Sequence, residues 1–234
     1  MVFLINDNIR YLVKFIPEEK FIDSLIMEGE LFLRPLSYYA HLEKEQSDCI
    51  RGDITEGLLL YCARICSPIY CTYAVFDKEV LPKGIIINKR APQSFFGEKK
   101  GYFAVINYND FISQLNADCF DGYSCTYGLV LYGSLSWEKQ KHLFVTEPWQ
   151  AAFVKPSKFS YQQEFRLLVH RNIEMIKDEK TTEEYKKAHG EYFPHPFYTY
   201  GHYIPKIGSL QHCVKKYCTE DFADYDDKHF ILKT

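Results

Sequence analysis

The chain has 234 residues, a formal net charge of -3 at pH 7, and a composition that is 47% hydrophobic and 17% aromatic. This composition excludes intrinsic disorder, and 19 Tyr and 18 Phe favour a sheet-rich fold. The small negative charge argues against attraction of the whole surface to nucleic acid, although local basic patches stay possible. No Pro-, Gly- or Ser-rich linker divides the sequence, so we expect one domain over residues 1–234.

The eight cysteines contain no C-x-x-C pair, and His195, His202 and His212 lack the spacing of a zinc site. We therefore interpret the cysteines as mostly buried, reduced thiols and expect no metal centre. The apolar run at the N-terminus is too short for a signal peptide, and no window approaches the ~18 consecutive apolar residues of a membrane helix. A cytoplasmic protein without membrane contact is the expectation.

The N-terminal part of the sequence predicts a strand, a helix and a second strand. Residues 9–15 have the β-branched and aromatic character of a strand. Pro17 and the two acids after it suit a first helical turn, and Gly29 suits the end of that helix. A strand over 30–36 and a helix beginning at Ser37 follow.

The rest of the chain predicts several more elements and one basic segment. Residues 89–100 interleave four cations with Phe95 and Phe96, which fits a nucleic-acid surface or an exposed loop, and we favour the loop. The acidic tail over 220–227 is expected to be solvated. The remaining predicted elements are a hairpin over 58–77, strands over 85–87, 102–106, 127–132, 159–169 and 197–204, and helices over 109–115 and 209–218.

The predicted strand 159–169 places three polar side chains on one face. Gln162, Glu164 and Arg166 recur at a period of two, about 7 Å apart per step, while the alternate residues are mostly apolar. A row of amide, carboxylate and guanidinium fits either a binding site or a solvated strand with a modest ion pair.

Two short motifs in this order resemble the ADP-ribosyltransferase fold. They are Ser134-Leu-Ser136 and Gln162-Gln-Glu164, which follow the strand, helix and strand near the N-terminus. The resemblance implies an α+β domain with split mixed or antiparallel sheets flanked by short helices, and NAD as a substrate. The distance between the N-terminal strands and Ser134 then requires an inserted hairpin and loop region at about 58–120.

The same resemblance implies the chemistry of each residue. Cleavage between nicotinamide and ribose develops oxocarbenium character, so a carboxylate near the sugar hydroxyls stabilises the transition state, and Glu164 takes that role. Gln162 would hold the acceptor, an amide or a nucleobase. The implied NAD-binding residues are Lys14 or Arg34 for the diphosphate, Tyr38 or Tyr39 for nicotinamide, and Ser134 and Ser136 for the ribose and the strands around it.

A second resemblance covers more of the chain. The segment from Gly29 to Ser37, the motif Asp53-x-x-Glu56-Gly57 and the run from Gln162 to Arg166 are similar to an uncharacterised bacterial family. That family has an Asn-Asp-Pro-Phe-Glu-Gly motif and a late Glu-x-Glu-x-Arg strand. It adds Asp53, Glu56 and Arg166 to the candidate site residues and brings no settled activity.

Three hypotheses follow from these motifs. The first is a mono-ADP-ribosyltransferase, a bacterial toxin or phage-defence effector that modifies RNA, DNA or a protein amide and that would be paired with an antitoxin protein. The second is a metal-dependent nuclease or phosphodiesterase with Asp53, Glu56 and Glu164 around Mg²⁺. The third is a binding module without catalysis, and we favour the first.

Overall fold

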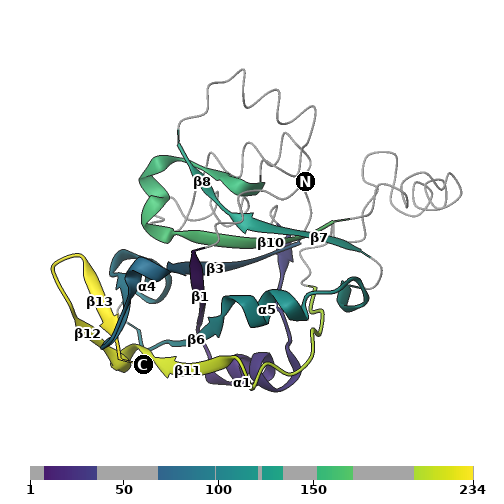
Figure 1. Cartoon of the computed structure of the whole chain (residues 1–234), viewed down its shortest axis with the longest axis horizontal. Coiled ribbons are helices and arrows are strands. Elements are labelled where there is room, and N and C mark those ends of the chain that lie inside the picture. Colours follow the sequence, from purple (N-terminus) through teal and green to yellow (C-terminus); the bar gives the residue numbers. More distant parts are fainter. Residues whose placement is uncertain are drawn as a thin grey trace, which may run out of the picture.

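The computed structural model describes residues 8–35, 68–97, 99–120, 123–133, 152–170 and 203–233. Within these ranges the chain has an α+β fold of mostly antiparallel strands with a few short helices (Figure 1). The α-helices of the described residues are α1 (Glu19–Glu28), α4 (Arg90–Phe96) and α5 (Tyr108–Gln114), and the 3-10 helices are η1 (Asp77–Glu79), η2 (Ala117–Phe120), η4 (Ser157–Gln162) and η5 (Thr219–Asp221). No helix in these ranges is long and apolar enough to cross a membrane.

The strands in the described part of the chain form three sheets. The main sheet has the order β11-β6-β1-β3-β10-β7, with β2 also paired to β3; the second has the order β12-β13-β5-β4, and the third is the parallel pair β8-β9. The bounds are β1 (Ile9–Ile16), β2 (Arg34–Pro35), β3 (Pro68–Phe76), β4 (Val80–Leu81), β5 (Gly84–Asn88), β6 (Tyr102–Asn107), β7 (Ser124–Leu129), β8 (Leu131–Tyr132), β9 (Val154–Lys155), β10 (Glu164–His170), β11 (Val214–Cys218), β12 (Phe222–Asp224) and β13 (His229–Leu232).

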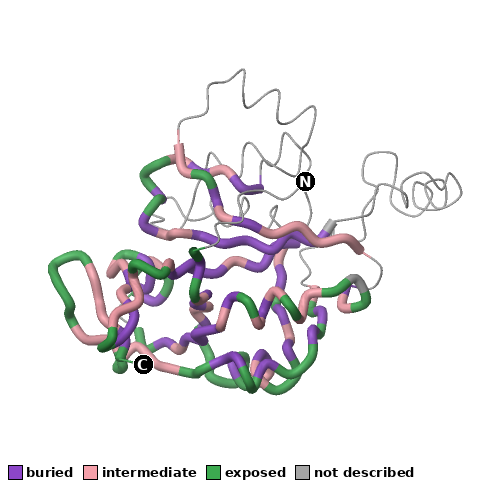
Figure 2. The backbone as a smooth tube through the Cα atoms, viewed as in Figure 1, coloured by how far each residue is buried: buried purple, intermediate pink, exposed green. Residues whose placement is uncertain are grey.

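One face of the main sheet packs against α1 and α5. Ile22 and Leu25 of α1 and Phe111 of α5 are buried against Leu12 and Phe165 of the sheet. Burial of side chains of this size contributes about 1.5–3 kcal/mol each. Figure 2 shows the resulting buried layer along β3 and β10. This layer holds β1, β3 and β10 in one rigid unit, and we call its side of the sheet the helical face.

The opposite face of the main sheet carries the second sheet, and we call it the outer face. Ile85 and Ile87 of β5 and Leu232 of β13 pack on Val13 and Phe103 of the main sheet. The ring of Phe103 also stacks on Phe222 with a centroid separation of 4.6 Å. The main sheet is thus covered on both sides over β1, β3 and β6.

Local patterns predict the first elements well. The strand at 9–15, the helix ending at Gly29, the strands at 85–87 and 102–106 and the helix at 109–115 are confirmed. Gly29 has φ 65°, a left-handed conformation that favours glycine, and its N–H donates to the Leu25 carbonyl at 3.0 Å. The helices among these elements are held by local capping and bonding, while the strands are recognised from local periodicity although their pairing partners are distant in sequence.

Other predictions of secondary structure are wrong. The helix over 209–218 is instead a turn followed by β11, an edge strand whose backbone bonds to β6 override the helical spacing. The segment 89–100 is not a loop but contains α4, whose Phe96 is 7% exposed. The acidic tail over 220–227 is largely exposed, as expected, and it also contains β12, which pairs with β13. Long-range pairing decides the case of β11, whereas α4 and the β12–β13 hairpin form from local backbone bonds.

The N-terminal second strand is shorter than predicted, and the region expected as an insertion contributes strands to the main sheet. Only Arg34–Pro35 forms β2, and Leu33 adds an isolated bridge to Tyr203. The region 58–120 contains β3 and β6, which lie in the middle of the main sheet. In the described residues this region is therefore an integral part of the fold. Residues 58–67 of the expected hairpin, and most of the strand expected over 197–204, lie outside the described residues.

Candidate functional site

The turn before β10 sets the position of Glu164. The strand predicted over 159–169 begins only at Glu164, because 157–162 is the 3-10 helix η4 and Gln163 adopts the left-handed conformation with φ 40° and ψ 49°. Such a conformation is costly for a residue other than glycine. The Gln163 side-chain amide donates to the Ala74 carbonyl at 3.1 Å and to the Glu79 carboxylate at 3.0 Å. These bonds fix the change from helix to strand.

Glu164 is a buried carboxylate bound by two cations. Arg166, two residues along the same strand face, donates from Nε to Oε1 at 3.0 Å and from Nη2 to Oε2 at 3.1 Å. Lys155 of β9 lies 2.8 Å from Oε2. Burial alone would raise the pKa of Glu164, but Arg166 and then Lys155 outweigh it and hold that pKa well below its usual range. The carboxylate is ionised at neutral pH.

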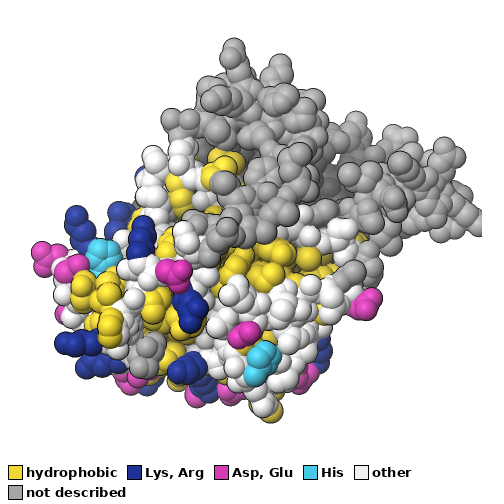
Figure 3. All heavy atoms as spheres, viewed as in Figure 1, with side chains coloured by type: hydrophobic (Ala, Val, Ile, Leu, Met, Phe, Trp, Pro, Cys, Tyr) yellow, Lys and Arg dark blue, Asp and Glu magenta, His cyan; other side chains and the backbone are white. Residues whose placement is uncertain are grey.

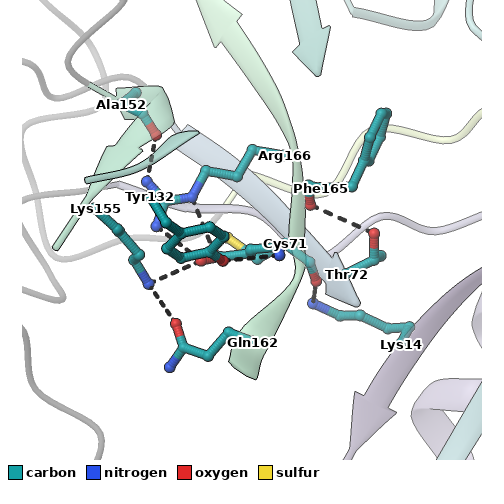
Figure 4. Close-up of polar contacts among 10 residues, drawn as sticks. Lys14, Cys71, Thr72, Tyr132, Ala152, Lys155, Gln162, Phe165 and Arg166 are labelled. Carbon is teal, nitrogen blue, oxygen red and sulfur yellow. Dashed lines mark hydrogen bonds and ion pairs between the residues drawn. The ribbon is translucent and has the colours of Figure 1, made fainter. Parts of the chain in front are cut away.

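Gln162 joins this cluster through Lys155 and not through the strand. Its carbonyl Oε1 accepts a hydrogen bond from the Lys155 ammonium at 2.9 Å, so one ammonium group bridges Gln162 and Glu164 (Figure 4). The prediction that Gln162 lies in a strand row with Glu164 is wrong, because it belongs to η4. The structure nevertheless brings the two residues together.

Neighbouring groups enclose the cluster. The Glu164 backbone N–H donates to the Tyr132 hydroxyl at 2.9 Å, and the Arg166 guanidinium donates from Nη1 to the Ala152 carbonyl. Cys71 faces Arg166 across the strands. Burial, and then the negative charge of Glu164, raise the pKa of the Cys71 thiol, so it is protonated at neutral pH and is a poor nucleophile.

Lys14 lies on the other face of the main sheet. It pairs in register with Ala104, on the helical face with Leu12, whereas Glu164 pairs with Tyr73 on the outer face. Pairing between β1 and β3 ends at Val13, so the strands diverge there. The Lys14 ammonium donates to the Cys71 carbonyl at 2.8 Å and lies 4.3 Å from the centre of the Tyr70 ring. Lys14 and Glu164 therefore lie on opposite faces of the sheet, and the charge of Glu164 makes only a minor contribution to the pKa of Lys14.

Arg34 is also apart from Glu164. It pairs with Ile69, which in turn pairs with Leu168 of β10. Leu168 is four residues beyond Glu164, about 13 Å along the strand at 3.3 Å per residue. The Arg34 guanidinium lies 5.0 Å from the Phe32 ring centre. The remaining predicted site residues lie outside the described residues: Tyr38, Tyr39, Asp53, Glu56, Ser134 and Ser136.

Lys155 is the site residue that the sequence does not indicate. It lies nine positions before Glu164, a spacing that no local rule pairs, and Pro156 after it is read only as the end of a helix. Its side chain is 10% exposed. A buried lysine next to a buried carboxylate is recognised only once β9 and β10 are placed together.

The basic segment around α4 is largely engaged within the fold. Lys89 forms an ion pair with Asp224, and Lys100 forms one with Glu220 at 3.0 Å. Phe95 is 39% exposed, while Phe96 is buried. These contacts favour a structural role for the segment over a nucleic-acid surface.

Comparison with protein-family models, curated proteins and solved structures finds no match. We therefore infer a function from the geometry around Glu164 together with the motif resemblance.

Proposed function

We propose that the protein is a NAD-dependent mono-ADP-ribosyltransferase whose site is built around Gln162 and Glu164. The observation that carries the proposal is the Lys155 ammonium, which bonds to both residues at 2.9 and 2.8 Å. The motif assigns these two residues to the acceptor and the ribosyl group, so their meeting on one cation supports a common site. The antiparallel α+β architecture and the order β1, α1, β2 agree with the proposed fold.

In the proposed reaction the bond between ribose C1′ and the nicotinamide nitrogen breaks, and its electron pair leaves with nicotinamide. A nitrogen or oxygen of the acceptor then bonds to C1′ and loses its proton. Glu164 stabilises the positive charge that develops on the ribose, because a carboxylate that is already ionised needs no proton loss during the reaction. Arg166 is the positioning residue that holds this carboxylate from one side.

Gln162 is suited to select the acceptor. Its Oε1 is engaged by Lys155, which orients the amide and leaves Nε2 as the atom with two N–H donors. Gln162 is half-buried, so its amide lies at the boundary of the cluster. A donor here matches a carbonyl on an amide side chain or on a nucleobase, in agreement with RNA, DNA or a protein amide as the acceptor.

The test is label transfer from NAD carrying ³²P in its adenylate phosphate to macromolecules of a cell lysate. Wild-type protein is expected to transfer label, and Glu164→Gln is expected to lower the rate by about 10²–10³-fold, as for loss of one electrostatic group at a reacting centre. Glu220→Gln is the matched control, because Glu220 lies in an exposed ion pair with Lys100. Gln162→Ala is expected to reduce transfer to the acceptor more than hydrolysis of NAD.

Absence of transfer by the wild-type protein, or transfer that Glu164→Gln leaves unchanged, contradicts the proposal. Because Glu164 is buried, each variant is first checked for a cooperative thermal unfolding transition. If Glu164→Gln does not fold, the half-buried Gln162→Ala variant decides the question.

A second candidate function is a binding module without catalysis. Its support is the number of bonds that Glu164 already makes, since Arg166 and Lys155 together contact both carboxylate oxygens. The nuclease hypothesis receives no such support: the part of the chain that the structure describes has no group of three or more potential metal ligands, and Asp53 and Glu56 lie outside it.

A further inference from the structure

The surface around η4 carries cations without neighbouring acids in its own segment. Residues 152–163 contain Lys155 and Lys158 but no Asp or Glu, and the first acid after them is the buried Glu164. Both ammonium groups lie over the ring of Phe159, at 5.8 Å for Lys155 and 4.7 Å for Lys158. The buried Lys155 and the exposed Lys158 therefore both lie near the ring of the buried Phe159.

Arg90 of α4 adds a third cation to the same surface. Its guanidinium lies 4.3 Å from the ring centre of Tyr161, the residue before Gln162. Lys and Arg side chains are visible on the side of the molecule where α4 and η4 lie (Figure 3). The nearby Glu79 carboxylate accepts hydrogen bonds from the Gln163 side chain and from the Phe76 backbone N–H, so it faces the end of β3. We call Arg90, Lys155, Lys158 and Gln162 the η4 cationic surface.

Lys155 can leave Glu164 without leaving that carboxylate unpaired. Arg166 alone bonds to both carboxylate oxygens, is 1% exposed and is anchored to the Ala152 carbonyl. Such two-point pairing is the stronger contact geometry for a carboxylate. Lys155 is instead a point charge on a flexible stem, already shared with half-buried Gln162.

We infer that the η4 cationic surface binds a phosphate-type anion, and that this anion draws the Lys155 ammonium away from Glu164 Oε2. Lys155 and Lys158 supply charge, and Gln162 Nε2 supplies a neutral donor. The displacement frees one carboxylate oxygen for a new hydrogen bond while Arg166 keeps Glu164 ionised. The identification of the anion with the diphosphate of NAD rests on the proposed function; the anion site itself does not.

Inorganic pyrophosphate is the probe, titrated calorimetrically into the full chain at low ionic strength. Lys155→Met is expected to weaken binding at least 10-fold, and Lys158→Met about 3-fold. The matched control is Lys215→Met, which removes the same charge from exposed β11, four strands away from β10 in the main sheet. Affinity in this control is expected to be unchanged.

A second measurement follows Glu164 itself in protein labelled with ¹³C at the glutamate carboxyl carbon. The Glu164 resonance, assigned from its loss in Glu164→Gln, is expected to shift when pyrophosphate is added to wild-type protein. In Lys155→Met no such shift is expected, because the ammonium is already gone. An adventitious ion on the surface would leave this resonance unmoved and would overturn the inference.

Absence of pyrophosphate binding, or equal affinity in wild type and Lys155→Met, also overturns it. If Lys155→Met does not fold, the Lys158→Met and Gln162→Ala variants test the anion site instead. Unchanged affinity of both variants for pyrophosphate would overturn the inference. Lys155-dependent binding without label transfer from NAD would preserve the anion site and reject the proposed transferase. Label transfer from NAD together with anion binding that does not depend on Lys155 would support the proposed transferase and reject the anion site.

Discussion

Two lysines are enclosed on opposite faces of the main sheet, and the structure neutralises them in different ways. Lys155 on the outer face lies 2.8 Å from a full negative charge, that of Glu164. Lys14 on the helical face has a backbone carbonyl at 2.8 Å and the face of the Tyr70 ring. Partial charges compensate a buried ammonium less than a carboxylate does. Burial accordingly lowers the pKa of Lys14, against smaller opposing effects of Cys71 and Glu164.

Lys155 is therefore a cation that can exchange partners, whereas Lys14 satisfies a hydrogen-bonding group of the backbone. Lys14 donates to β3 at Cys71, beyond Val13 where the pairing of β1 with β3 ends. Its ammonium substitutes there for a missing strand partner. Lys155, by contrast, contacts the side chains of Glu164 and Gln162. We therefore expect the chemistry to take place on the outer face. Substitutions on either face are expected to change stability.

The largest effect is expected from Glu164→Gln. This substitution leaves Arg166 and Lys155 buried opposite a neutral amide, and breaking a buried pair in this way costs about 3–5 kcal/mol of unfolding free energy. Because folding lowers the pKa of Glu164 below its ordinary value of 4.5, the contribution is complete above that pH and declines as the pH falls further. Urea unfolding of wild type and Glu164→Gln at pH 7 measures the loss of unfolding free energy, and the same comparison at pH 3 measures how far that loss declines.

Glu220→Gln is the control for that experiment, since its ion pair with Lys100 is exposed and is expected to contribute less than about 1 kcal/mol. A Glu164→Gln variant as stable as this control at pH 7 would show that the cluster contributes little to folding.

An effect of opposite sign is expected from Tyr70→Phe. The Tyr70 hydroxyl is buried, and in the described part of the chain it has no hydrogen-bond partner. Removing an unsatisfied buried hydroxyl is expected to stabilise the protein by about 1 kcal/mol. The matched variant Tyr73→Phe removes a hydroxyl that accepts from the Asn88 N–H at 3.3 Å and is expected to destabilise. Equal changes in the two midpoints of thermal unfolding would contradict this distinction.

The smallest effect at neutral pH is expected from Lys14→Met, below about 1 kcal/mol. Loss of the bond to the Cys71 carbonyl destabilises, while removal of a buried ammonium stabilises, and the two oppose each other. The pH dependence is the sharper test. Because folding lowers the pKa of Lys14, the unfolded chain holds more protons between that lowered pKa and 10.5, so wild-type stability rises with pH in this window.

The measured quantity is the difference in unfolding free energy between wild type and Lys14→Met from pH 7 to pH 10. It should move in favour of wild type as the pH rises. A difference that is constant with pH, or that moves the other way, would show that Lys14 is not held in an environment that disfavours its charge.

The sequence predicts those parts of the fold whose cause is local. The first strand, α1 with its Gly29 end, and α5 follow from periodicity and capping. By contrast, β11 has adjacent Lys215 and Lys216 and no strand-like alternation, and it becomes a strand only because β6 offers it backbone partners.

The same division applies to the candidate site. Glu164 and Arg166 are found from the sequence because residues two apart on a strand share a face, which the structure confirms. The prediction for Gln162 is wrong because Gln163 adopts a left-handed conformation. The alternation of polar and apolar residues in this segment gives no sign of that conformation. Lys155, and the placement of Lys14 behind the sheet, depend on how separate strands pair. No spacing in the sequence contains that information.

The order of strands in the main sheet also bears on how the chain matures during translation. Strand β6 is complete at residue 107, but its outer neighbour β11 begins only at residue 214. At about 5–20 residues per second, roughly a hundred residues take about 5–20 s to synthesise. During that interval the hydrogen-bonding edge of β6 is open to other chains. A chain that ends before residue 214 would leave this edge unpaired and is expected to be prone to aggregation.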